Sequence, residues 1–152
     1  MLFGGRGKTA QAEPAEAPAA VPARRDALIM AVDDDATSRA AIINALEIIG
    51  YRVHALSNYA DWDTAWRSGP TPALLVLDIM LSEPRRGGYE ILRALRRFDA
   101  DTPVIMVSSR NTPSDAAFAK ANNANAFVSK VQSEFRHPER GLVATVNKLL
   151  SS

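Results

Sequence analysis

ALLVLD, residues 73–78, is a short apolar run that ends at a carboxylate. Four more strand-like runs occur along the chain: 27–32 before Asp33 and Asp34, 51–56, 103–107 before Ser108, and 125–129 before Lys130. Runs that are apolar throughout, as at 27–32 and 73–77, are typical of strands buried on both faces of a sheet. We therefore predict five strands, four of which lead into a polar or charged side chain.

Helical segments separate these strands. The stretch 36–49 carries its apolar residues on one stripe and is followed by Gly50, a common helix stop. Further helices are expected at 58–67, at about 89–98, from 112 or 114 to 121, and at about 138–150, with Asn58 and either Thr112 or Ser114 as candidate caps. Asp35 is expected to cap the helix at 36–49.

The alternation of strands and helices indicates an α/β fold with a parallel sheet covered by helices on both faces. Right-handed crossovers make a doubly wound sheet the natural arrangement. Ligand sites in such sheets lie at the carboxyl ends of the strands, so the residues that follow the strands are the candidates for chemistry.

Composition narrows the function classes. The 152 residues suit one domain plus a tail, 47% are apolar, and the net charge of +1 gives no sign of a nucleic-acid binder. The absence of cysteine excludes disulfides and thiol chemistry, and no apolar run reaches the roughly 20 residues of a membrane span. We expect residues 1–25, rich in Ala and Pro, to be a disordered tail, and residues 26–152 to fold in the cytoplasm.

The strand-end residues fit one kind of chemistry. Asp33, Asp34 and Asp78 converge at one sheet edge, where a divalent cation such as Mg²⁺ would relieve their repulsion. A carboxylate can act as a nucleophile toward phosphorus, while a hydroxyl at Ser108 and the ammonium of Lys130 can contact phosphoryl oxygens. Taken one at a time, these residues are ordinary caps and loop residues; the ordered set favours aspartyl phosphorylation.

The segments AVDDDATSR, LLVLDIM, PVIMVSS and AFVSK, in this order, resemble the receiver domains of two-component response regulators over about residues 27–150. The resemblance implies a flavodoxin-like sheet with strand order 2-1-3-4-5. It also implies that Asp78 is the phosphoacceptor. Asp33, Asp34, Asp78 and the backbone carbonyl of Met80 would bind Mg²⁺, with Mn²⁺ as an alternative ion.

The resemblance assigns further roles to residues on or just after the fourth and fifth strands. Ser108 would be the switch hydroxyl and Ser109 the small residue that leaves room for phosphate. Phe127 would be the switch aromatic, and Lys130 would contact the phosphoryl group. Phosphorylation would change the surface formed by the fourth helix, the fifth strand and the fifth helix.

Partners follow from the same resemblance. A histidine kinase or phosphotransfer protein would donate the phosphoryl group, and a downstream protein would read the changed surface. Because only two serines follow Leu150, we expect a single-domain regulator without a DNA-binding domain. It would be a phosphoacceptor that assists its own phosphorylation and dephosphorylation rather than an enzyme, and a monomer or a weak phosphorylation-dependent dimer.

Three features depart from the family pattern. Val131 stands where a proline usually follows the lysine, so the sequence leaves both a cis and a trans Lys130–Val131 bond open. The loop 82–88 carries an apparent insertion with Glu83, Arg85 and Arg86. In the family that the sequence resembles, the positions of Met80 and Arg110 tune the lifetime of the phosphorylated state, and here their bulk could screen the site from water.

Three other functions stay open. A pseudo-receiver would use the same fold as a phosphorylation-independent interaction module. An aspartate-nucleophile phosphatase would share the chemistry but usually needs a second acid where Met80 stands. A flavodoxin-like cofactor binder would want a phosphate loop after the first strand, where this chain has DDDATSR.

Overall fold

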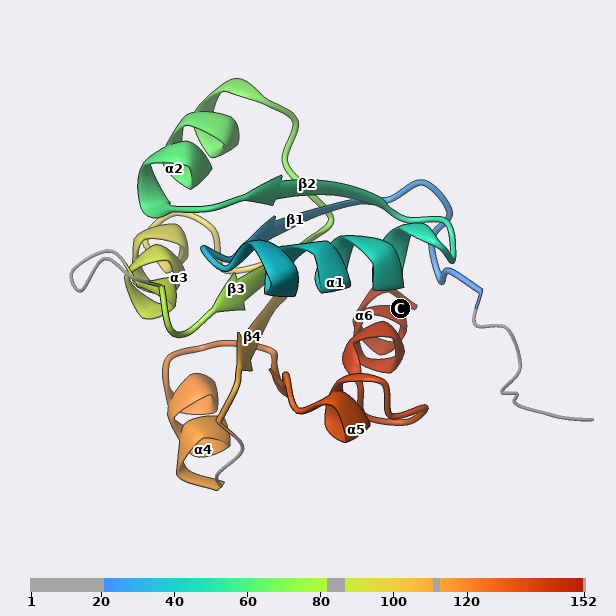
Figure 1. Cartoon of the computed structure of the whole chain (residues 1–152). Coiled ribbons are helices and arrows are strands. Elements are labelled where there is room, and N and C mark those ends of the chain that lie inside the picture. Colours follow the sequence, from blue (N-terminus) through green and yellow to red (C-terminus); the bar gives the residue numbers. More distant parts are fainter. Residues whose placement is uncertain (1–20, 82–86, 111–112, 152) are drawn as a thin grey trace, which may run out of the picture.

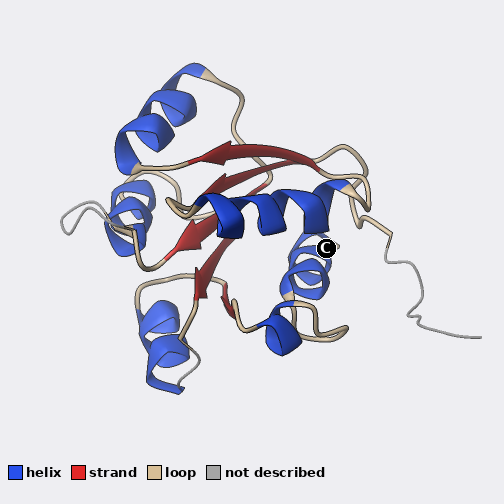
Figure 2. Cartoon of the chain, viewed as in Figure 1, coloured by secondary structure: helices blue, strands red, loops and turns tan. Residues whose placement is uncertain are grey.

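The computed structural model describes residues 21–81, 87–110 and 113–151. Within these ranges, five strands form one parallel sheet with the order β2-β1-β3-β4-β5 (Figures 1 and 2). The strands are β1 (Leu28–Val32), β2 (Arg52–Leu56), β3 (Leu74–Asp78), β4 (Val104–Ser108) and β5 (Ala126–Ser129). The predicted doubly wound α/β fold and its strand order are confirmed.

Helices cover both faces of the sheet (Figure 1). They are α1 (Ala36–Glu47), α2 (Tyr59–Ser68), α3 (Gly88–Arg96), α4 (Pro113–Ala121), α5 (Gln132–Phe135) and α6 (Leu142–Leu150). Apolar residues of α1 and α6 pack on one face, and those of α2, α3 and α4 pack on the other. Within β1, Ile29 and Ala31 enter the first core while Met30 and Val32 enter the second, which explains why this strand is apolar throughout.

The predicted helix caps form at two positions. Asp35 Oδ2 accepts the backbone N–H of Ser38 at 2.7 Å, and Asn58 Oδ1 accepts that of Asp61 at 2.8 Å. Gly50 follows α1 with a φ of 113°, a conformation that favours glycine. Thr112, one of the two candidate caps of α4, lies outside the described residues, and Ser114 lies inside that helix.

The helix predicted at about 138–150 forms, but its start was wrong by about four residues, and α5 was not predicted. A short helix, α5, precedes it, and α6 begins only at Leu142. Gly141 is extended at the start of α6, and a Cβ there would lie 2.4 Å from the carbonyl oxygen of Phe135. The chain therefore turns tightly between the two helices, and Arg140 Nε donates to Glu134 Oε1 at 2.6 Å across this turn.

The last residues of the predicted tail contact the domain. The backbone N–H of Ala23 donates to the Tyr51 hydroxyl at 2.9 Å, and Asn147 Nδ2 donates to the carbonyl of Val21 at 2.9 Å. Val21 and Ala23 are therefore hydrogen-bonded to the domain. Residues 1–20 lie outside the described part, and the predicted boundary at 25 stays a prediction. No helix in the described ranges is long and apolar enough to cross a membrane.

Candidate functional site

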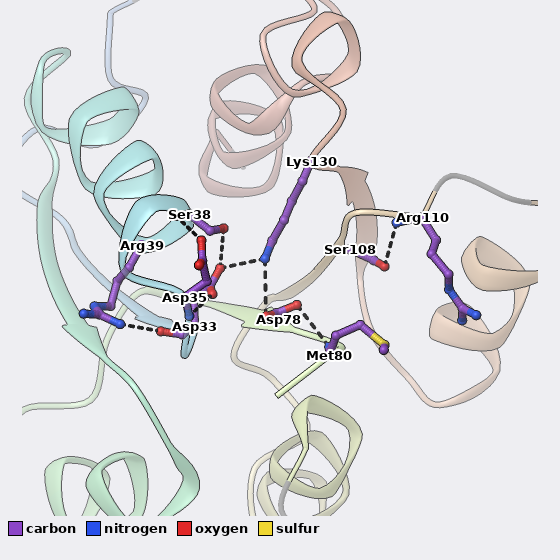
Figure 3. Close-up of polar contacts among 9 residues, drawn as sticks. All are labelled: Asp33, Asp35, Ser38, Arg39, Asp78, Met80, Ser108, Arg110 and Lys130. Carbon is purple, nitrogen blue, oxygen red and sulfur yellow. Dashed lines mark hydrogen bonds and ion pairs between the residues drawn. The ribbon is translucent and has the colours of Figure 1, made fainter. Parts of the chain in front are cut away.

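The sheet brings the predicted strand-end residues to one edge. Asp33 directly follows β1, Asp78 ends β3, Ser108 ends β4, and Lys130 directly follows β5. Because β1, β3, β4 and β5 are consecutive neighbours in the sheet, their carboxyl ends lie side by side (Figure 3). This arrangement is what the parallel topology predicts.

Three carboxylates form an acidic cluster at this edge. One oxygen each from Asp33, Asp34 and Asp78 can be chosen such that all lie within 4.8 Å of one another. Asp33 is fully buried and Asp78 is 3% exposed, whereas Asp34 is partly exposed. Burial raises the pKa of Asp78, and the charge of Asp33 raises it further, against the opposing effect of Lys130.

This donor set fits a hard divalent cation. Three carboxylates close together provide oxygen ligands, and the partly exposed side of the cluster at Asp34 leaves access for water. A cation there would also offset the repulsion that raises the pKa of Asp78. Asp33, Asp34 and Asp78 are therefore the residues that would hold Mg²⁺.

Lys130 lies between two of these acids. Its Nζ is 2.8 Å from Asp33 Oδ2 and 3.3 Å from Asp78 Oδ2, and its side chain is 16% exposed (Figure 3). The backbone N–H of Lys130 donates to the carbonyl of Ser108 at 2.8 Å, so β4 fixes the backbone position from which the lysine side chain extends. The ammonium partly offsets the negative charge that the two carboxylates bring together.

Asp33 is held by groups that the sequence did not reveal. Ser38 Oγ donates to Asp33 Oδ2 at 2.6 Å, and Arg39 Nη1 donates to its carbonyl at 2.9 Å. Both residues lie in the first turn of α1, after the Asp35 cap. The sequence did offer a signal for Ser38: it stands three residues after the predicted cap, Asp35, and a side chain at that position faces back toward the start of the helix.

The backbone after Asp78 and after Ser108 forms the same turn, in which the side-chain oxygen accepts the N–H two residues further on. The N–H of Met80 donates to Asp78 Oδ1 at 3.0 Å, and the N–H of Arg110 donates to Ser108 Oγ at 3.1 Å. The Met80 side chain is 56% exposed. The proposed role of its carbonyl in metal binding stays a prediction.

The switch candidates on β4 and β5 occupy different environments. Ser108 is fully buried, and its hydroxyl accepts from Arg110 rather than facing Asp78 (Figure 3). Ser109 is exposed. Phe127 is partly buried and packs against the core under α2, α3 and α4. The assigned switch roles of these three residues stay predictions.

The side chain of Arg110 is held by an acid of α4. Its Nη2 donates to Asp115 Oδ1 at 2.7 Å, and Asp115 is 11% exposed at the side chain. Figure 3 shows the guanidinium extending away from Asp78 and Lys130. In this structure Arg110 therefore does not cover the site. Sequence reasoning missed Asp115, because nothing in the chain marks it as the partner of Arg110.

Of the other two departures from the family pattern, the structure describes the Lys130–Val131 bond but not the loop insertion. The described residues contain no cis peptide bond, so Lys130–Val131 is trans. The predicted insertion with Glu83, Arg85 and Arg86 lies outside the described residues. Just beyond it, a Cβ on Gly88 would lie 2.2 Å from the carbonyl oxygen of Asp78, so only glycine lets α3 begin this close to the acid.

Comparison with solved structures places this fold among known receiver domains. The receiver domain of the Francisella response regulator 1452 is 19% identical, with a TM-score of 0.69 over 82% of this chain and 96% of that one, which supports the fold alone. The BeF₃-activated DrrB receiver domain is 26% identical, with a TM-score of 0.67 over 83% and 98% of the two chains.

Curated relatives share part of their length with this chain. The probable transcriptional regulator ycf27 of Pyropia yezoensis is 33% identical over 102 residues, which is 67% of this chain and 40% of that protein. The transcriptional regulatory protein CssR of Bacillus subtilis (strain 168) is 29% identical over 122 residues, or 80% and 50% of the two chains. The chain thus spans about half or less of the length of these relatives.

A family model gives the decisive match. The model for the response regulator receiver domain covers residues 29–137, a range that reaches all five described strands and contains all the predicted site residues. Phosphorylation and Mg²⁺ binding at an acidic pocket are typical of this family, which is a class of signalling domains. The chain therefore belongs to the response regulator receiver domain family of two-component systems.

Proposed function

We propose that Asp78 accepts a phosphoryl group from a histidine kinase or phosphotransfer protein in a Mg²⁺-dependent reaction. The observation that supports this most is the meeting of three groups: Asp78, the two further acids near it, and a lysine whose Nζ is 3.3 Å from Asp78 Oδ2. This set supplies a nucleophile, a cation site and a fixed positive charge. Among the described residues, no second group of three acids comes together in this way.

The transfer itself is a displacement at phosphorus. A carboxylate oxygen of Asp78 forms a bond to phosphorus while the bond to the donor atom, a histidine nitrogen, breaks and leaves its electron pair on the donor. The Met80 N–H holds Asp78 Oδ1 at 3.0 Å and so orients the carboxylate. The nucleophile must be ionised, and Lys130 and this N–H both oppose the rise in its pKa.

The remaining residues manage charge. Mg²⁺ bound by Asp33, Asp34 and Asp78 would neutralise charge on the phosphoryl oxygens. Lys130, held between Asp33 and Asp78, needs only a short movement to pair with a phosphoryl oxygen. Ser38 and Arg39 keep Asp33 in place while this happens.

Signalling would use the side of the domain near β5. When the Ser108 hydroxyl turns toward the phosphoryl group, it gives up the N–H of Arg110, which is tied to α4 through Asp115. The readout surface is then formed by α4, β5 and α6, where α6 is the helix that the sequence predicted as the fifth. A downstream protein that binds this surface completes the proposed pathway.

The pseudo-receiver is the alternative function. Two observations favour it: the trans step from Lys130 to Val131, and the Ser108 hydroxyl, which bonds to Arg110 instead of facing Asp78. Under this alternative the same surface binds a partner without phosphorylation. The two functions differ in whether Asp78 can be modified at all.

Phosphorylation with a small donor separates the two. The protein is incubated with acetyl phosphate and Mg²⁺, and hydroxylamine-labile phosphate is measured by intact mass. Wild type and Asp63→Asn, which removes a partly exposed acid on α2, should both take up one phosphoryl group, and Asp78→Asn should take up none. An unmodified wild type that also forms no beryllofluoride complex would establish the pseudo-receiver.

A further inference from the structure

Four strand ends share one local turn. In each, a side-chain oxygen accepts the backbone N–H two residues further on. The pairs are Asp33 with Asp35 at 3.0 Å, Asp78 with Met80 at 3.0 Å, Ser108 with Arg110 at 3.1 Å, and Ser129 with Val131 at 3.1 Å. The first three acceptors already belong to the proposed site, whereas Ser129 has no assigned role.

Ser129 is built into the sheet beside the site. It is the last residue of β5, is 5% exposed, and lies opposite Ser108 in the pairing of β4 with β5. The next N–H, that of Lys130, donates to the Ser108 carbonyl at 2.8 Å. The N–H after that belongs to Val131, lies beyond the end of β5, and is accepted by the Ser129 hydroxyl. Two hydrogen bonds therefore fix the backbone on either side of Lys130.

Val131 contributes to this turn through its backbone. Its carbonyl accepts the N–H groups of Glu134 and Phe135 at 2.8 Å each, which begins α5. The residue as a whole is 45% exposed. The Ser129 hydroxyl therefore joins the end of β5 to the start of α5, and Lys130 is the residue in the middle of that connection.

We propose that Ser129 is a positioning residue for Lys130. By accepting the Val131 N–H, its hydroxyl fixes the turn that directs the ammonium to Asp33 and Asp78, at 2.8 and 3.3 Å. This inference rests on the proposed function, in which the same ammonium contacts the phosphoryl group. Hydrogen bonds to the ammonium weaken once the distance grows beyond this range, so a relaxed turn would lower the rate of transfer.

Three variants test the role of the hydroxyl. Ser129→Ala should lower the rate of phosphorylation by acetyl phosphate at saturating Mg²⁺ by about three- to tenfold, the equivalent of one hydrogen bond. Saturating Mg²⁺ keeps any change in metal affinity out of this rate, because the ammonium that moves also contacts Asp33 and Asp78. Ser129→Thr should restore the rate. Thr145→Val, which removes a hydroxyl bond of 2.7 Å to Gly141 within α6 and its cap, should leave the rate unchanged.

A double-mutant cycle tests the partner of the hydroxyl. Val131 has a φ of −56°, which proline adopts, and proline has no N–H to donate. In a Val131→Pro background, Ser129→Ala should therefore have little further effect on the rate. An equal loss in both backgrounds would mean that the hydroxyl does not act through the Val131 N–H, and the proposal would be overturned.

A measurement without phosphorylation keeps the two proposals separate. The ¹³Cε and ¹⁵Nζ resonances of Lys130 in the metal-free protein should shift in Ser129→Ala and return in Ser129→Thr. If wild type takes up no phosphoryl group, the proposed function is wrong, and these resonances still decide the role of Ser129. If wild type is phosphorylated while Ser129→Ala keeps both the wild-type rate and the wild-type resonances, the positioning role alone is wrong.

Discussion

The ammonium of Lys130 lies 2.8 Å from Asp33 Oδ2, although β3 and β4 separate the strands that carry these two residues. Asp33 is fully buried and also accepts the Ser38 hydroxyl at 2.6 Å. The lysine thus extends along the sheet edge from β5 to a fixed partner, Asp33, beside β1. Asp78, at the end of β3, is also close to its ammonium. This contact keeps the charge in place before a phosphoryl group arrives.

The first prediction concerns Lys130. Lys130→Ala should slow phosphorylation of Asp78 by about 10- to 100-fold, because one preorganised positive group at the transferred oxygens is lost. Without Mg²⁺ it should also lower the free energy of unfolding by about 1.5–3 kcal/mol, since Asp33 loses a charged partner. Stopped-flow phosphorylation and urea unfolding measure the two effects. Lys148→Ala, on the exposed side of α6, should match wild type; a Lys130→Ala rate equal to this control would contradict the assigned role.

The second prediction separates the two acids after β1. Asp34→Asn should weaken Mg²⁺ binding at least tenfold with little change in stability, because Asp34 is partly exposed. Asp33→Asn should weaken binding and also destabilise the fold, because Asp33 is buried and contacts Lys130 and Ser38. Calorimetric Mg²⁺ titration and thermal unfolding distinguish them. Equal stability losses in both variants would be inconsistent with this division.

The third prediction concerns two adjacent glycines. Gly88→Ala should cost about 1–3 kcal/mol and slow phosphorylation, because the added Cβ would lie 2.2 Å from the Asp78 carbonyl oxygen. Gly87→Ala is a matched control, since its nearest neighbour, the Ile79 carbonyl oxygen, is 3.6 Å away. Urea unfolding of both variants measures the difference. Similar stabilities would show that α3 can move away from Asp78 without cost.

The fourth prediction addresses the lifetime of the phosphorylated state. Met80→Asn should speed dephosphorylation, because a polar side chain replaces an apolar one two residues after the phosphoacceptor. Arg110→Ala should change the rate much less, because Asp115 holds the guanidinium at 2.7 Å, away from the site. Decay of the radiolabelled phosphoprotein gives both rates. If neither variant departs from wild type, Met80 and Arg110 do not tune the lifetime.

The fifth prediction is a pH dependence at the turn before β4. Burial alone would raise the pKa of Asp99, but hydrogen bonds from Thr102 and from the Asp101 N–H outweigh it and hold this pKa below its ordinary value. A carboxyl group whose pKa is lowered by folding stabilises the fold at pH values above its ordinary pKa. This contribution is lost as the pH falls through the folded-state pKa. Asp99→Ala should therefore cost about 1 kcal/mol at neutral pH and much less in strong acid.

Urea unfolding at several pH values tests this dependence. Asp101→Ala serves as the control, because the hydrogen bond that Asp101 gives to Asp99 comes from its backbone N–H, which the substitution keeps. The difference between Asp99→Ala and wild type should shrink toward low pH, while that of the control should stay small throughout. A cost that is independent of pH would mean that the Asp99 charge is not what stabilises the turn.

Much of the fold was predictable because the strands are buried on both faces. A run such as 74–78 is apolar on every side chain before the acid, and few structures other than a covered parallel strand accommodate it. The site followed from topology, since parallel strands place Asp33, Asp78 and Lys130 at one edge. The family resemblance added the roles, which spacing alone does not give.

What the sequence missed depends on contacts between distant side chains. The partner of Arg110 is Asp115 rather than an acid of the site, and the ammonium of Lys130 lies nearer to Asp33 than to Asp78. The late start of α6 was missed because the close approach of Gly141 to Phe135 appears only in three dimensions. The Ser129 hydroxyl was not singled out in the sequence, because its donor, the Val131 N–H, is evident only from the turn in the structure.

The central claim is that Asp78 is the phosphoacceptor, and the most direct test locates the modified atom. The protein is treated with acetyl phosphate and Mg²⁺, the acyl phosphate is reduced with borohydride, and the resulting homoserine is located by tandem mass spectrometry. We predict homoserine at position 78 in wild type and at no other acid. Homoserine at Asp33 or Asp34, or at no position while the protein still carries phosphate, would contradict the claim.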